Sequence, residues 1–149
     1  MNQDSDMIEF TLTLDQSAYR APAQPRATIR LANAGDAAVI VNKRFALNYS
    51  DAASYECEIK LMIHTSAGDE LPFAARVNIG DPADRHFTEL APGQSLAREY
   101  ALERTYDVSA PGRYTIQALY QNQTDPSIGP AWKGELMSNT IAFEVASTG

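Results

Sequence analysis

The sequence predicts an all-β chain that folds as a sandwich of two antiparallel sheets. Apolar residues alternate with polar ones along many short segments, no helical period lasts longer than a turn, and turn sequences separate the segments. An alternation of period two is typical of a strand that buries one face. Pro-Gly pairs occur at Pro92-Gly93 and at Pro111-Gly112. Proline presets φ for the second position of a turn, and glycine tolerates the positive φ that follows.

The N-terminal part of the chain contains two strand signals. Residues 8–14 alternate Ile, Phe and Leu with Glu and Thr, which predicts a half-buried strand. The stretch 15–25 contains two prolines, and we interpret it as an extended or turning linker. Residues 28–31 alternate again, and Asn33-Ala34-Gly35-Asp36 then turns the chain.

The middle of the chain predicts three further strands. Residues 39–47 read as one long strand with a break near Asn42-Lys43. In residues 57–63 the apolar positions Cys57, Ile59, Leu61 and Ile63 share one face. The sequence Ser66-Ala67-Gly68-Asp69 predicts a tight hairpin turn into a strand over residues 71–79.

The C-terminal part predicts the last three strands. A turn at residues 90–93 leads into a strand over 96–102, after a segment 80–89 that we interpret as a loop. The alternation over 114–120 is the clearest in the chain, and residues 141–145 close the fold. The expected total is therefore about seven to eight strands, in a single domain spanning residues 1–149 with a flexible N-terminus at 1–7.

Composition and charge exclude several functions. The net charge of −7 argues against nucleic acid and anionic membranes, because phosphates are bound by clustered Lys and Arg. No apolar run reaches membrane-spanning length, so we expect no membrane insertion. The N-terminus is acidic and polar, unlike a signal peptide, which leaves a cytoplasmic protein or a mature extracytoplasmic segment as alternatives. The sequence does not fix the oligomeric state.

Catalytic and metal-binding patterns are weak. His64 and His86 are the only histidines, and there is no Gly-x-Ser-x-Gly nucleophile motif, so we expect a protein that is not an enzyme. Asp81, Asp84 and His86 do not have the spacing of a zinc or calcium site, and we expect no metal and no cofactor. Solvated loop residues are the simpler interpretation of all of these.

Cys57 is the only cysteine, so no disulfide can form within the chain. Glu56 and Glu58 flank it, which would raise the pKa of its thiol and suppress its reactivity. Because it also shares the apolar face of its strand, we expect Cys57 to be a buried, inert structural residue.

One group of residues resembles a known class of domains. Leu90-x-Pro92-Gly93 precedes one strand, and Gly112-x-Tyr114-x-Ile116 opens the next. This arrangement resembles bacterial immunoglobulin-like and fibronectin type III-like β-sandwich domains. The resemblance implies an immunoglobulin-like topology, in which Tyr114 is a buried corner tyrosine whose hydroxyl bonds to backbone. More faintly, the chain is similar to the intracellular proteinase inhibitors of bacilli, which share a β-sandwich and a strand of this type.

The long loop Gln121 to Gly134 is the best candidate for a binding site. It contains Ile128 and Trp132, the only tryptophan, together with two prolines, and Gly129 and Gly134 are its flexible points. Exposed aromatic residues provide large contact areas at low entropic cost. The alternative interpretation makes Trp132 a lid that folds back over the core. Tyr49 and Tyr55, in the loop Asn48 to Glu56, are further candidate contact residues.

These observations predict a non-enzymatic binding or accessory module that contacts a protein partner through its end loops. Two alternatives belong to other classes. A protruding rigid loop would favour a proteinase inhibitor that presents an extended segment to a protease. A coplanar strip formed by Trp132, Tyr49 or Tyr55 would favour a carbohydrate-binding module.

Overall fold

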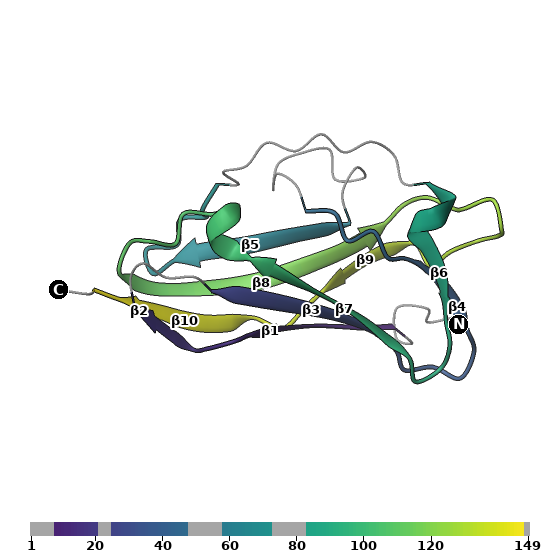
Figure 1. Ribbon diagram of the computed structural model, residues 1–149, viewed down its shortest axis with the longest axis horizontal. Helices are drawn as coiled ribbons and strands as arrows, with labels where there is room; N and C mark the ends of the chain where they lie inside the picture. The colour runs from purple at the N-terminus through teal and green to yellow at the C-terminus, as the bar shows by residue number, and fades with distance from the viewer. Residues whose placement is uncertain (1–7, 21–24, 48–57, 73–82, 148–149) are drawn as a thin grey trace.

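The computed structural model describes residues 8–20, 25–47, 58–72 and 83–147, and over these residues the protein is an all-β sandwich (Figure 1). Its strands are β1 (Ile8–Leu14), β2 (Ala18–Arg20), β3 (Arg26–Asn33), β4 (Val39–Asn42), β5 (Ile59–Thr65), β6 (Phe87–Leu90), β7 (Ser95–Ala101), β8 (Gly112–Asn122), β9 (Gly134–Met137) and β10 (Ile141–Ala146). Short 3₁₀ turns form η2 (Asp84–His86) and η3 (Leu102–Arg104). Within the described ranges, no helix is long and apolar enough to cross a membrane.

The first sheet has the order β1-β3-β7 and is antiparallel throughout. Its strands follow the predicted alternation, because β1 buries Ile8, Phe10 and Leu12 and exposes the residues between them. In β3, Ile29 and Leu31 are fully buried. The prediction of which residues of these two strands face the core is therefore confirmed.

The second sheet has the order β2-β10-β8-β5, and its central strand is β8. One edge of β8 pairs with β5, and the other pairs first with β10 and then with β9. The pairing of β2 with β10 is parallel, so the expectation of purely antiparallel sheets is wrong at this position. Strand β2 lies within the segment 15–25 that we expected to be a linker, and it runs beside the last strand in the same direction.

A third, two-stranded sheet joins β4 to β6 at one end of the molecule (Figure 1). Strand β6 includes residues 87–89 of the segment that we expected to be a loop, and it buries Phe87 and Leu90. Strand β4 ends at Asn42, at the predicted break, and Phe45 then adopts a positive φ of 51°. The chain therefore does not continue as one long strand to Leu47, which forms only an isolated bridge with Ile59.

Two other predicted features lie near β5 and β7. The turn at Ser66–Asp69 is confirmed, because the Thr65 amide bonds to the Asp69 carbonyl at 2.9 Å and Gly68 has a φ of 91°. Most of the strand expected over residues 71–79 lies outside the described residues. Strand β7 ends one residue earlier than expected, and Leu102 is buried at the start of η3.

The two larger sheets enclose one hydrophobic core. Phe10 of β1 packs against Tyr120 of β8, with ring centroids 5.8 Å apart. Tyr19 of β2 meets the ring of Phe143 edge-on at 5.9 Å. The core cluster draws on residues from Ile8 to Val145, so both ends of the described chain contribute to it.

Tyr114 has the geometry expected of a corner tyrosine. Its side chain is 4% exposed, and its hydroxyl donates a hydrogen bond of 2.6 Å to the carbonyl of Ala110, four residues earlier. Its ring stacks on Phe143 at a centroid distance of 5.2 Å. Gly112 takes a φ of 149°, a conformation that L side chains rarely adopt. The burial of Tyr114 and the bond from its hydroxyl to the backbone are as expected from the resemblance.

Candidate functional site

The loop of residues 123–133 connects β8 to β9 and projects from the end of the sandwich that carries β4 and β6 (Figure 1). We call it the 123–133 loop. The predicted loop began at Gln121, but Gln121 and Asn122 belong to β8, where both are buried. Even so, the loop is far longer than an ordinary hairpin connection.

Asp125 closes the base of the 123–133 loop. One of its carboxylate oxygens accepts hydrogen bonds from the Ala131 amide at 2.9 Å and from the Lys133 ammonium group at 2.5 Å. The hydrogen bond from Lys133, followed by that from Ala131, lowers the pKa of Asp125. The carboxylate therefore stays ionised at neutral pH and ties the two arms of the loop together.

A turn forms the tip of the loop. The Gly129 amide bonds back to the Pro126 carbonyl at 3.4 Å, which leaves Ser127 and Ile128 as the two central residues. The Ser127 amide donates a 2.9 Å hydrogen bond to the carboxylate of Asp84 in η2, and bonding with Ser127 lowers the pKa of Asp84. The tip is thus attached to a second element of the structure.

Ile128 is the most exposed large apolar side chain in the described residues, with 69% of its surface accessible. Of the two prolines that flank it in the sequence, Pro126 is buried, whereas Pro130 is exposed. The structure therefore presents Ile128 on a hydrogen-bonded turn, as a contact residue would require.

Trp132 lies in the core and not on the surface. Its side chain is 4% exposed and its ring stacks on Tyr120, with centroids 5.5 Å apart. A hydrogen bond of 2.8 Å from its amide to the carbonyl of Ile40 in β4 fixes the backbone so that the ring points inward. The alternative of a lid over the core therefore describes the position of Trp132, and its indole offers little surface for contact with a partner.

A buried polar cluster lies beneath this end of the sandwich. Its centre is the carboxylate of Glu58, which is 3% exposed and forms an ion pair of 2.8 Å with Arg44. The same carboxylate accepts hydrogen bonds from the Asn42 side chain at 3.1 Å and from the Ala46 amide at 2.9 Å. Such dense hydrogen bonding offsets the cost of removing two charges from water.

Asn122 connects this polar cluster to the 123–133 loop. Its side-chain oxygen accepts a hydrogen bond from Asn42 at 3.1 Å. Its side-chain nitrogen donates to the carbonyls of Thr124 and Trp132, at 2.8 and 2.9 Å. The buried cluster therefore holds both ends of the loop. The sequence does not predict this cluster, because Asn42 and Asn122 are separated by 80 residues and no local pattern relates them.

The segment after β4 is held in an unusual conformation. Phe45 is the only non-glycine residue with positive φ in the described part of the chain, and it is 3% exposed. Positive φ is rare for a bulky residue and costs free energy that the surroundings must supply. The Tyr100 hydroxyl bonds to the Phe45 carbonyl at 2.6 Å, and the Arg98 guanidinium lies 5.9 Å from the centre of the Phe45 ring.

The histidines lie in different settings. His64 is in β5, opposite Thr115 of β8, whereas His86 ends η2. The Nδ1 atom of His86 accepts a hydrogen bond of 2.8 Å from the Ala83 amide, and desolvation together with nearby Arg85 and Arg44 lowers its pKa. In the part of the chain that the structure describes, no three His, Cys, Asp or Glu side chains form a group that could hold a metal ion.

Three of the predicted site residues cannot be placed. Tyr49 and Tyr55, proposed as contact residues, and Cys57, expected to be buried, lie outside the described residues.

Comparison with known proteins gives no family for this chain. No protein-family model matches the sequence, and no curated protein is significantly similar to it.

Proposed function

We propose that this protein is a non-enzymatic binding module with an immunoglobulin-like scaffold, and that it contacts a protein partner through the 123–133 loop. Ile128 is the centre of the proposed contact. An exposed isoleucine on a scaffolded loop suits a protein surface with an apolar depression, because burying such a side chain contributes about 1.5–3 kcal/mol.

The observation that carries this proposal is the combination of exposure and order at the loop tip. Ile128 is 69% exposed, yet the residues on either side of it are held by hydrogen bonds to Asp84 and within the turn. A loop that is ordered before binding loses less conformational entropy when a partner docks. Exposing an apolar residue on such a loop has no evident benefit for folding, which favours a role in recognition.

The two alternative functions receive less support. A proteinase inhibitor would present an extended segment, whereas Ser127 and Ile128 occupy the centre of a turn closed from Gly129 to Pro126. A sugar-binding platform built on Trp132 would need an accessible indole, and this ring is 4% exposed.

Quantitative capture from extracts of the source organism tests the proposal, with three immobilised forms of the protein compared side by side. The forms are the wild type, Ile128→Ser and Met137→Ser. Met137 is the matched control, because it is the other exposed large apolar residue of the described chain, 51% accessible on β9. We expect a protein that the wild type and Met137→Ser retain equally and that Ile128→Ser loses by about tenfold or more.

Two results would contradict the proposal. One is a retained protein whose yield is the same with Ile128→Ser, which would place the contact elsewhere on the surface. The other is the absence of any specifically retained protein when all three forms are folded, as judged by circular dichroism.

A further inference from the structure

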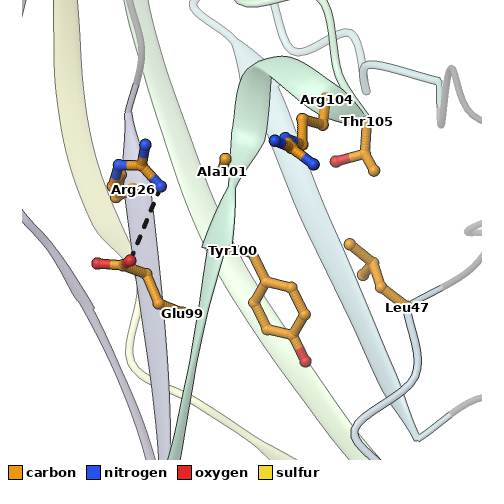
Figure 2. Close-up of a pocket in the computed structure, with 7 residues that line it drawn as sticks. All are labelled: Arg26, Leu47, Glu99, Tyr100, Ala101, Arg104 and Thr105. Carbon is orange, nitrogen blue, oxygen red and sulfur yellow. Dashed lines mark ion pairs between the residues drawn. The ribbon is translucent and has the colours of Figure 1, made fainter.

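A pocket of about 330 Å³ lies beside η3, at the edge of the sandwich formed by β7 (Figure 2). Its lining residues are Arg26, Leu47, Glu99, Tyr100, Ala101, Arg104 and Thr105. They come from β3, β7, η3 and the chain that follows the strained Phe45. The pocket does not include any residue of the 123–133 loop, so an inference about it is independent of the proposed function. Its volume is at the lower end of the range for small-molecule sites.

The charged groups of the pocket have a net positive charge on a protein whose overall charge is −7. Arg26 forms an ion pair of 3.8 Å with Glu99, and both side chains are about half exposed. These two charges offset each other. Arg104 has no ion pair with any of the described residues, so its guanidinium is the charge left uncompensated among the described residues that line the pocket. A guanidinium offers paired donors that match a carboxylate.

The rest of the pocket separates polar from apolar surface. Figure 2 shows the guanidinium of Arg104 and the hydroxyl of Thr105 on one side, and the ring of Tyr100 and the side chain of Leu47 on the other. The Tyr100 ring is fixed, because its hydroxyl is bonded to the carbonyl of Phe45 at 2.6 Å. Leu47 is held by its bridge to Ile59. A ligand that fits this division has an anionic head and a short apolar body.

We infer that this pocket binds a carboxylate on a short apolar stem. The carboxylate meets Arg104 and the Thr105 hydroxyl, which turns away from its long 3.4 Å hydrogen bond to the Leu102 carbonyl in order to donate to the ligand. The stem lies against Tyr100 and Leu47. Two kinds of ligand have this chemistry, namely a small organic acid and the C-terminal carboxylate of a peptide with an apolar last residue. A single uncompensated guanidinium favours a monoanion over a dianion such as a phosphate monoester.

Titration by two-dimensional NMR tests the inference, with 3-phenylpropanoate as the probe and its neutral amide as the matched control. We expect saturable shifts of the amides of Tyr100, Ala101 and Thr105 with the acid, at a dissociation constant on the order of 1 mM. The amide should bind at least about tenfold more weakly. A tripeptide ending in Phe, compared with its C-terminal amide, separates the peptide source from the free acid.

Three variants locate the binding. Arg104→Gln should weaken binding of 3-phenylpropanoate by about tenfold, because it removes a charge-assisted hydrogen bond. Arg30→Gln is the matched control, since it makes the same change at an exposed position of β3 outside the pocket, and it should have little effect. Glu99→Gln should strengthen binding by about threefold, because it removes the only anionic group among the described residues that line the pocket.

Several outcomes would overturn the inference. One is that the acid and its amide bind equally well, and another is that Arg104→Gln and Arg30→Gln weaken the binding of the acid to the same extent. A third is that neither the free acid nor the tripeptide causes saturable shifts up to about 20 mM, which is well above the expected dissociation constant. If only the tripeptide binds, the pocket recognises a chain terminus.

Discussion

Replacing Trp132 by alanine is expected to destabilise the protein strongly. The indole stacks on Tyr120 at 5.5 Å, and it lies so close to Gly134 that a Cβ there would meet two of its ring atoms at 3.5 Å. Its Nε1 atom has no hydrogen-bond partner in the described structure, so the ring contributes through packing alone. Loss of a buried aromatic ring of this size costs about 3–5 kcal/mol.

Urea unfolding followed by far-ultraviolet circular dichroism measures this cost, because the variant has no tryptophan left to report by fluorescence. Trp132→Phe is the matched control. It retains an aromatic ring and, since no hydrogen bond is lost, should cost only about 1–2 kcal/mol. The native emission of the wild type should be blue-shifted. A loss below about 1 kcal/mol for Trp132→Ala, together with the red-shifted emission of a solvated indole, would refute the burial of this side chain.

Three further predictions follow from the buried contacts. Tyr114→Phe removes one buried hydroxyl and should lower the free energy of unfolding by about 1 kcal/mol, whereas an unchanged urea midpoint would contradict the corner role. Glu58→Ala removes the buried carboxylate that pairs with Arg44 and accepts a hydrogen bond from the Ala46 amide, and it should cost about 3–5 kcal/mol. Adding Arg44→Met should recover part of this loss, and strictly additive losses would contradict the coupling. The pKa of His86 is lowered in the folded protein, so its contribution to stability is present above the usual value of 6.5 and is lost as the pH falls below it. Wild type should therefore lose more stability than His86→Gln between pH 7.5 and 5, and parallel urea midpoints of the two proteins would contradict the role of the hydrogen bond from Ala83.

The sequence predicts those parts of the fold whose signal is local. Alternation of period two identifies β1, β5, β10 and the first half of β8, because each buries one face against the opposite sheet. From Ala118 onward every residue of β8 is buried. The Gly112-x-Tyr114 pair after a Pro-Gly turn predicts the corner, since the hydroxyl reaches a carbonyl only four residues away.

Other features could not be predicted because their causes are not local. Strand β6 has only four residues and takes its structure from pairing with β4. The direction of Trp132 depends on the backbone bond to Ile40, which no periodicity within the loop encodes. Likewise, the Glu58 cluster joins residues from distant parts of the chain, and an isolated glutamate in a sequence is ordinarily expected at the surface.

The proposed role of the 123–133 loop requires that its tip be ordered in the free protein. Backbone ¹⁵N relaxation measures this directly, through the order parameters of Ser127, Ile128 and Gly129. If the bonds to Asp84 and Pro126 hold the tip, these values should be close to those of β8, at about 0.8 or above. Values below about 0.6 at the three positions, with β8 remaining rigid, would contradict a preorganised contact surface.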